Sequence, residues 1–139
     1  MVENKFISIN IAVVTISDTR ELKNDKSGDT LHNRITQFGH KVTVREIVKD
    51  DFNKISDLFK KLLQNKDIDV IISTGGTGLT GRDITPEVME TLFEKTIDGF
   101  GEMFRWLSFK KINTSALQSR ALAGVAFGKY IFCLPGSPS

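Results

Sequence analysis

Short apolar runs of strand length alternate along this chain with segments of helical period, and this alternation restricts the fold more than any other feature. The runs are "SINIAVVTI" at residues 8–16, "HKVTVREIV" at 40–48 and "DVIIST" at 69–74. Runs this rich in Val and Ile are typical of strands buried on both faces. Strands that are separated by helices predict an α/β fold with a mainly parallel sheet and right-handed crossovers.

The clearest helix is predicted for residues 52–63, where apolar side chains recur at helical spacing and Asp51 is placed to cap the first turn. A second helix is predicted to begin near Thr85 and Pro86, because threonine can cap a helix and proline suits the first helical position. Further helices are expected at about residues 29–37, 98–111 and 114–124.

The last part of the chain predicts an antiparallel hairpin. The stretch "VAFGKYIFCLPG" at residues 125–136 has the pattern of two short strands around Gly128-Lys129, and a two-residue Gly-X loop is typical of a type II′ turn. The hairpin therefore adds at least one antiparallel strand to the sheet. The sequence stops at "LPGSPS", directly after this apolar run, and we expect a further helix to follow Ser139.

Size and composition favour a single globular domain in the cytoplasm. The chain has 139 residues, 40% of them apolar and 26% charged, with a net charge of +2 and no block of Lys or Arg. This charge gives no support for a nucleic-acid or membrane surface. One cysteine excludes an intrachain disulfide and favours a reducing compartment. The first ten residues lack the apolar core of a signal peptide, and no apolar run approaches the ~20 residues of a membrane span.

Polar stretches follow four of the predicted strands at their carboxyl ends. In open α/β sheets, ligands bind outside the carboxyl ends of the strands. Because the ends of parallel strands meet at one edge, we expect these stretches to converge there although they lie far apart in sequence. They are Ser17-Asp18-Thr19, Lys49-Asp50-Asp51, residues 74–83 and residues 135–138.

The glycine-rich stretch "STGGTGLTGRDITPE" at residues 73–87 predicts a site for phosphate groups. Consecutive N–H groups of glycines can line a concavity that suits phosphate oxygens, and threonine hydroxyls add donors. The pattern is neither a P-loop nor a dinucleotide fingerprint, because the Gly-Lys-Ser/Thr and the G-x-G-x-x-G order are both missing. A mobile surface connection is the alternative. The predicted donors are Thr74, Gly75, Gly76, Thr77 and Gly78.

Two acids at this edge predict a magnesium site. A carboxylate at Asp83 would repel phosphate unless a cation lay between them, and Mg²⁺ serves that purpose. Asp50 is a second candidate ligand, since Asp51 is the better placed of the two to cap the next helix. Capping is the alternative role for Asp83. Arg82 either clamps phosphate or pairs with Asp83, and Asp18 is expected to be a turn or cap residue.

Other reactive residue types show no functional pattern. His32 and His40 lack partners at metal spacing, so a structural zinc is not expected. Ser137 lacks the G-x-S-x-G context of a hydrolase nucleophile, and Cys133 is expected to pack inside a strand. Trp106 and its aromatic neighbours fit a core or subunit interface better than a stacking site for a ring ligand.

The sequence resembles the MogA/MoaB family of molybdenum cofactor biosynthesis proteins, and within it the MoaB branch most. The resemblance covers nearly the whole chain. Its most specific markers are the glycine-rich stretch and "LPGSP", in that order. The other markers are "TISDTR", "DKSGD", "IVKDD", "GFGEMFRWLSFKKI" and "TSALQSRALAG".

The resemblance implies a three-layer α/β domain over residues 1–139, with helices on both faces of the sheet, that assembles as trimers or hexamers. It also implies Mg²⁺-dependent adenylylation of molybdopterin by ATP, with release of pyrophosphate and possible hand-over to a molybdate-inserting enzyme. The alternative is a non-catalytic molybdopterin carrier of the same fold. The two key acids of the family fall on Asp50 and Asp83. The ligand-binding positions fall on Ser17, Asp18, Thr74, Gly75, Gly76, Thr77, Gly78, Arg82, Ser115, Arg120, Pro135, Gly136 and Ser137.

One residue departs from the family pattern. The chain carries Lys49 where the MogA branch tends to have proline before the acid, which affects how the side chain of Asp50 is aimed.

Overall fold

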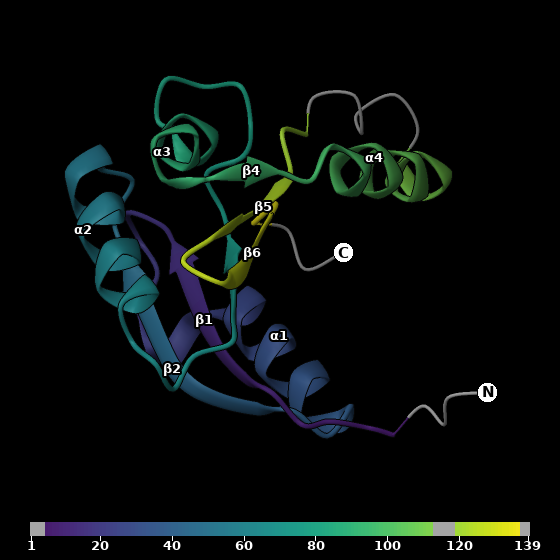
Figure 1. Cartoon of the computed structure of the whole chain (residues 1–139). Coiled ribbons are helices and arrows are strands. Elements are labelled where there is room, and N and C mark those ends of the chain that lie inside the picture. The colour runs from purple at the N-terminus through teal and green to yellow at the C-terminus, as the bar shows by residue number, and fades with distance from the viewer. Residues whose placement is uncertain (1–4, 113–118, 137–139) are drawn as a thin grey trace.

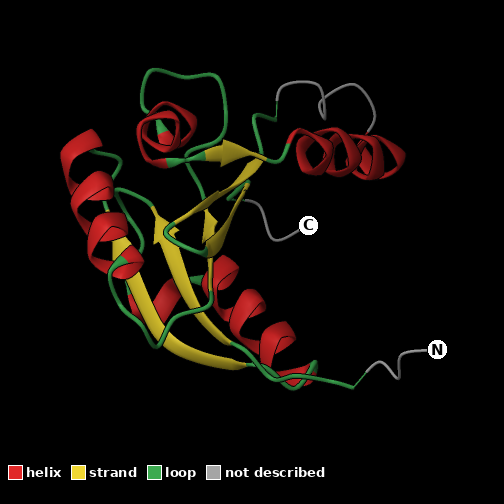
Figure 2. Ribbon diagram, in the orientation of Figure 1, coloured by secondary structure: helices red, strands yellow, loops and turns green. Residues whose placement is uncertain are grey.

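Six strands form one mostly parallel sheet with helices on both faces (Figures 1 and 2). The computed structural model describes residues 5–112 and 119–136. The strand order is β2-β1-β3-β6-β5-β4. Strands β2, β1, β3 and β6 run parallel, whereas β5 is antiparallel to both of its neighbours. The strands are β1 (Asn10–Ile16), β2 (Lys41–Val48), β3 (Val70–Thr74), β4 (Lys95–Thr96), β5 (Leu122–Ala126) and β6 (Lys129–Leu134).

The helices follow the parallel strands as the alternation of segments predicts. They are α1 (Lys26–Gln37), α2 (Phe52–Leu63), α3 (Thr85–Leu92) and α4 (Asp98–Ile112), with a short 3-10 turn η1 (Leu22–Asn24) before α1. In the described residues, 5–112 and 119–136, no helix combines the length and apolar character needed to cross a membrane.

Alternate residues of the central strands pack into two separate cores. One core joins β1, β3 and β6 to α2 and α3, and its fully buried centre includes Val14, Ile71 and Phe59. The other lies on the opposite face, where Val13 and Val70 pack against Ile35 of α1. Burial of both faces explains why these strands lack polar alternation. Helix α4 lies on the α1 side, where Phe100 meets Phe132 of β6 edge to face at 5.2 Å between ring centroids.

Helix α1 begins three residues earlier than predicted. Its first residue is Lys26, because the carboxylate of Asp25 accepts a hydrogen bond of 3.0 Å from the N–H of Gly28 and caps the helix. The prediction for α2 is confirmed, and Asp51 caps it by accepting from the N–H of Lys54 at 2.9 Å.

Two predictions near the C-terminus are wrong. The hairpin turns at Phe127-Gly128 instead of Gly128-Lys129, and both turn residues have positive φ (52° and 74°), which is the type I′ pattern. The end of the helix predicted at 114–124 is strand β5; the described residues before it, 119–121, are irregular. The small side chains of β5 serve packing, since a Cβ on Gly124 would lie 2.4 Å from the Phe93 ring.

The short strand β4 was not foreseen. Its residues, Lys95 and Thr96, pair with Val125 and Gly124 of β5 at the edge of the sheet. Two exposed polar residues carry no periodic signal, so their pairing depends on the neighbouring strand.

Candidate functional site at the carboxyl ends of the strands

The predicted convergence of loops at one sheet edge is confirmed for the described residues. The N–H of Ser17 donates to the carbonyl of Val48 at 2.9 Å, which joins the β1 and β2 loops. The hydroxyl of Thr74 donates to the carbonyl of Pro135 at 2.8 Å, which joins the β3 and β6 loops. Two predicted binding residues, Ser115 and Ser137, lie outside the described residues.

The glycine stretch begins in a conformation that favours glycine. Gly75 and Gly76 have φ values of 106° and 72°, in the left-handed region. The N–H of Gly75 donates to the carbonyl of Leu134 at 2.9 Å, so it extends the sheet and is not available to an anion. Within the described residues, the N–H groups of Gly76, Thr77 and Gly78 donate to no protein acceptor. Of the predicted donor stretch 74–78, the N–H groups of residues 76–78 are therefore the ones that stay available to an anion.

Thr85 locks the glycine stretch onto the start of α3. Its hydroxyl donates to the carbonyl of Gly75 at 3.1 Å, and its N–H donates to the carbonyl of Gly76 at 3.0 Å. The side chain is completely buried. The sequence suggested that Thr85 caps α3, but the residue at the cap position is Ile84 and Thr85 is the first helical residue. Its hydroxyl instead fixes the backbone of the cradle.

Arg120 fastens the far side of the same loop. Its Nε donates to the carbonyl of Gly78 at 2.7 Å, and its terminal nitrogens contact the carbonyl of Asp83 and the carboxylate of Glu87, the latter at 2.6 Å. Its N–H also donates to the carbonyl of Thr77 at 2.8 Å. These contacts give Arg120 a role in shaping the loop.

Asp83 closes a turn of its own within the loop. Its carboxylate accepts from the N–H of Thr80 at 3.1 Å and from the Thr80 hydroxyl at 2.7 Å. It does not cap α3. A Cβ on Gly78 would lie 2.7 Å from the Asp83 carboxylate, so this acid lies directly against the predicted cradle.

Arg82 pairs across the site and not with its neighbour. Its guanidinium bonds the carboxylate of Asp18, which also accepts from the N–H of Asp50 at 3.2 Å. Asp18 thereby connects the loops after β1, β2 and β3. The residue pattern predicts a turn or cap role for Asp18 and the family resemblance implies ligand binding, but neither indicates these pairings, because the partners lie 32 and 64 residues away.

The carboxyl groups of the site have opposite pKa shifts. Desolvation raises the pKa of Asp50, the negative charges of Asp18 and Asp83 raise it further, and Arg82 offsets only part of this. For Asp18, desolvation also acts upward, but the hydrogen bonds from Arg82 and the Asp50 N–H and the nearby positive charges lower the pKa overall. Of Asp18 and Asp50, Asp50 is therefore the carboxyl group whose ionised form is disfavoured in the fold.

The carboxylates of the site can hold Mg²⁺ only if a bound substrate supplies some of the oxygens that coordinate the metal ion. In residues 5–112 and 119–136, no three acidic, His or Cys side chains are grouped so as to hold a metal. Mg²⁺ is commonly held by one or two carboxylates together with substrate phosphates, not by an all-protein cage. Asp50 and Asp83 offer hard oxygen donors beside the cradle, and desolvation together with the negative charges of Asp18 and Asp83 raises the pKa of Asp50.

Asp25 and Arg45 form a buried ion pair next to the site, which the sequence does not predict. Asp25 is 1% exposed and accepts from the Thr15 hydroxyl at 2.7 Å and from Arg45 at 3.2 Å. Arg45 also bonds Asp29 at 2.7 Å. The Ser27 hydroxyl in the same turn donates to the carbonyl of Gly136. The only signal in the sequence was the "DKSGD" motif itself.

The remaining sequence predictions are outside the site. His40 lies in the turn before β2, where its Nδ1 accepts from the N–H of Ile9 at 3.2 Å. Cys133 is fully buried in β6, as predicted, and burial raises its pKa to about 12. Trp106 is 60% exposed on α4 with the Lys110 ammonium 3.8 Å from its ring centroid, so it is not a core residue.

Comparison with known proteins identifies the family. The family described as "probable molybdopterin binding domain" matches residues 12–139. Molybdenum cofactor biosynthesis protein B of Bacillus cereus is 45% identical over 130 residues, which cover 93% of this chain and 77% of that protein. The protein of the same name from Escherichia coli K12 is 43% identical over 136 residues, covering 98% and 80%.

Solved structures agree with the observed fold. A crystal structure of molybdenum cofactor biosynthesis protein B superimposes with a TM-score of 0.92 at 44% identity, covering 95% of this chain and 83% of that one. The tungsten cofactor synthesizing protein MoaB of Pyrococcus furiosus gives 0.82 at 33% identity, covering 94% and 84%. A MogA structure gives 0.83 at 28% identity, covering 93% and 85%. The mainly parallel sheet with antiparallel C-terminal strands is the fold of these proteins.

Proposed function

The chain belongs to the MogA/MoaB family of molybdenum cofactor biosynthesis proteins, and on this premise we propose that it is a molybdopterin adenylyltransferase. Molybdopterin and ATP would give adenylyl-molybdopterin and pyrophosphate. One observation supports this activity. The N–H groups of residues 76–78, which donate to no acceptor in the described part of the chain, lie beside the carboxylates of Asp50 and Asp83. A site for phosphate transfer requires hydrogen-bond donors to the phosphate oxygens and carboxylate oxygens that can bind a metal ion, and both lie at this sheet edge.

The reaction needs no dedicated general base. An oxygen of the terminal phosphate of molybdopterin attacks the α-phosphorus of ATP in line, the new P–O bond forms, and the bond from the α-phosphorus to the bridging oxygen breaks. The electron pair leaves with pyrophosphate. A phosphate monoester has a second pKa of about 6 and is already mostly ionised at neutral pH. Positioning and charge neutralisation are the work left to the protein.

Each element of the site would serve one of these tasks. The N–H groups of Gly76, Thr77 and Gly78 would donate to phosphate oxygens, held in place by Thr85 and Arg120. Bound Mg²⁺ would neutralise charge on the phosphates, and Asp50 and Asp83 are the residues that would hold it.

Arg82 would act at the rim of the site. It is exposed and tied to Asp18 only through an ion pair, so its guanidinium is free to turn towards a bound phosphate.

Asp83→Asn tests the proposed metal role. We expect the variant to lose turnover while it keeps most of its affinity for the pterin, because asparagine retains the size but not the charge. Asp51→Asn is the matched control: it lies next to Asp50, and asparagine caps a helix as well as aspartate does. Near-normal adenylylation by Asp83→Asn would exclude a metal-holding role for this residue.

A second candidate function is a molybdopterin carrier without transferase activity. The observation in its favour is that Oδ2 of Asp83 already accepts two hydrogen bonds from Thr80, which leaves Oδ1 as the oxygen that a metal would have to use. Calorimetric titration separates the two functions. A transferase binds Mg·ATP in the presence of pterin, whereas a carrier takes up the pterin and shows no heat with Mg·ATP.

Membership of the family also suggests which proteins this chain contacts. We propose a homo-oligomer, trimer or hexamer, that contacts itself through α4 and passes its product to a molybdate-inserting enzyme. Four large apolar side chains of α4 are between 47% and 65% exposed, more than a solvated helix normally carries. Light scattering tests this: Trp106→Glu should lower the mass of the assembly. The four side chains are Met103, Trp106, Leu107 and Phe109.

A further inference from the structure

Arg82 supplies a positive charge among the carboxylates of the site. Its guanidinium bonds the carboxylate of Asp18, and its charge also acts on the neighbouring carboxylate of Asp50. We propose that Arg82 is a built-in counter-ion of the site, which keeps free metal ions away from these carboxylates until the phosphate of a substrate draws it off. The inference rests on the proposed function and describes how metal binding at that site is regulated.

Three carboxylates converge here from three separate loops. Asp18 follows β1, and its Oδ1 accepts from the N–H of Asp50, which follows β2, at 3.2 Å. A Cβ built on Gly76 would lie 3.4 Å from Oδ1 of Asp50. A Cβ built on Gly78 would lie 2.7 Å from Oδ2 of Asp83, so these two acids flank the cradle. Negative charge is thereby concentrated at one point of the sheet edge, where a nearby cation lowers the repulsion between the carboxylates.

Within the described residues, Arg82 is the main source of that positive charge. It forms the ion pair with Asp18, and it is the only cation that acts to lower the pKa of Asp50, which Asp18 and Asp83 both raise. Lys49 also acts on Asp18, but it forms no ion pair with the described part of the chain. Arg82 therefore offsets the charge that a bound metal ion would otherwise offset.

The contact that holds Arg82 is suited to release. Its side chain is 68% exposed, and in the described residues its guanidinium bonds Asp18 and no other group. An exposed ion pair of this kind is weak in water. A phosphate offers the guanidinium two oxygens at once and carries more charge than one carboxylate. Because Asp83, the next residue in the chain, lies against Gly78, a phosphate at the cradle lies on the same side of the loop as Arg82.

Release of Arg82 couples metal binding to phosphate binding. While the guanidinium stays among the carboxylates, its charge repels a divalent cation. Once a phosphate has drawn it away, Asp50, Asp83 and the phosphate oxygens are together available to the metal. No three acidic, His or Cys side chains of residues 5–112 and 119–136 are grouped to hold a metal, so the phosphate oxygens are needed as well. The protein would therefore take up its metal together with the phosphate and not before it, and each would tighten the binding of the other.

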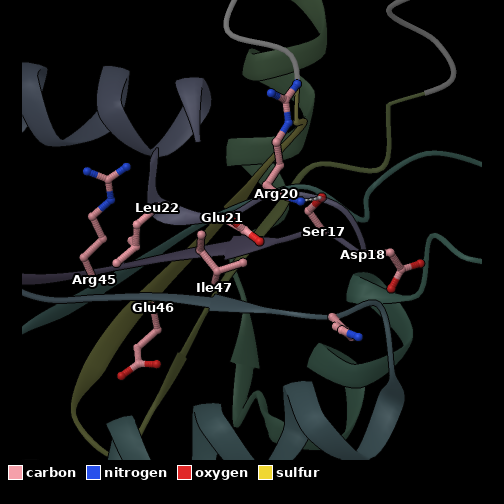
Figure 3. A pocket seen from close by; sticks show the side chains of 9 residues that line it. Ser17, Asp18, Arg20, Glu21, Leu22, Arg45, Glu46 and Ile47 are labelled. Atoms are coloured by element: carbon pink, nitrogen blue, oxygen red, sulfur yellow. Dashed lines mark hydrogen bonds between the residues drawn. The ribbon is translucent and has the colours of Figure 1, made fainter. Parts of the chain in front are cut away.

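Binding of Mn²⁺ in the absence of any phosphate tests the counter-ion role, with the free Mn²⁺ measured by electron paramagnetic resonance. Arg82→Gln should bind Mn²⁺ about five- to thirty-fold more tightly than the wild type, because a unit charge close to the metal is removed. Arg82→Lys keeps the charge and should stay near the wild-type affinity. Arg20→Gln is the matched control: it removes the same charge from the loop after β1, but the Arg20 guanidinium points away from Asp18 (Figure 3), so the affinity should change less than about two-fold.

Binding of inorganic pyrophosphate without metal, followed by calorimetry, tests the release. Asp18→Asn removes the charge that holds Arg82, while the asparagine oxygen still accepts from the N–H of Asp50. This variant should bind pyrophosphate several-fold more tightly than the wild type, because Arg82 no longer has to leave a partner. Arg82→Gln should bind pyrophosphate several-fold more weakly, because the guanidinium is lost.

The outcomes separate this inference from the proposed function. If Arg82→Gln binds Mn²⁺ no more tightly than the wild type, or if Arg20→Gln gains as much affinity, Arg82 is not the counter-ion of the site. If Asp18→Asn binds pyrophosphate more weakly, Asp18 does not restrain Arg82 and the release is wrong. If both titrations agree with the inference but no adenylyl product forms with molybdopterin and Mg·ATP, the counter-ion role stands and the proposed transferase is wrong.

Discussion

Gly76→Ala is the substitution whose effect on stability follows most directly from the geometry of the cradle. A Cβ at this position would lie 2.2 Å from Oγ1 and 3.3 Å from Cβ of Thr85, which is buried and hydrogen-bonded to Gly75. The φ of 72° adds a separate backbone cost, since a side chain in this region is disfavoured by about 1–2 kcal/mol. Overpacking of a buried contact adds about 1–3 kcal/mol. The free energy of unfolding should fall by about 2–5 kcal/mol.

Two other glycines separate these contributions. Gly128 has a φ of 74° but nothing within 4 Å of its Cβ position, so Gly128→Ala measures the backbone cost alone, about 1 kcal/mol. Gly81 has neither a positive φ nor a neighbour within 4 Å, so Gly81→Ala should change stability by less than ~0.5 kcal/mol. All three are compared by urea denaturation at pH 7.

A double-mutant cycle identifies the clash itself. Thr85→Ala removes the hydroxyl that the new methyl group meets, so the loss in Gly76→Ala/Thr85→Ala should be smaller than the sum of the single losses. If Gly76→Ala is as stable as the wild type, or if the two losses simply add, the argument that Thr85 is packed against the cradle is refuted.

Three further predictions concern charges. Asp50→Asn should raise the free energy of unfolding at pH 7 by roughly a few tenths of a kcal/mol, because the raised pKa means that the ionised carboxyl destabilises the fold; the gain should shrink as the pH falls and the wild-type carboxyl is protonated. Urea titrations at pH 7 and pH 4 measure this, and a gain that grows towards pH 4 would contradict it. Arg45→Met should cost about 3 kcal/mol, because it leaves the buried Asp25 without its cation, whereas Asp29→Asn, at the exposed end, should cost under ~1 kcal/mol. Cys133 has a pKa raised to about 12 by burial, so a thiol reagent at pH 8 should label it only as fast as the protein opens, and rapid labelling of the native protein would be inconsistent with that burial.

The parts of the fold that sequence reasoning predicts well are those specified by local signals. Helix α2 has a regular apolar stripe and a capping aspartate, and both of its ends agree with the prediction. The start of α1 was misplaced because Asp25 is held by Thr15 and Arg45, and the Arg45 contact spans 20 residues. The turn at Phe127 was misplaced because nothing in a phenylalanine indicates a left-handed conformation.

The site likewise has features that the sequence predicts and features that depend on long-range contacts. Its position was predictable, because the carboxyl ends of parallel strands must share an edge. Its internal contacts were not, because they depend on loops that meet only in the folded chain. Arg82 pairs with Asp18 in place of the adjacent Asp83, and the Thr85 hydroxyl holds Gly75 instead of capping its own helix.

The most direct test of the proposed activity is a labelling experiment with molybdopterin and Mg·ATP. With ATP labelled at the α-phosphorus, the label should move to the pterin product, while label at the γ-phosphorus should appear in pyrophosphate. Transfer should require the divalent cation and should be lost in Asp50→Asn, with Asp51→Asn as the control that keeps it. Pterin binding by the wild-type protein without any α-label in the pterin would contradict the transferase and leave the carrier function in its place.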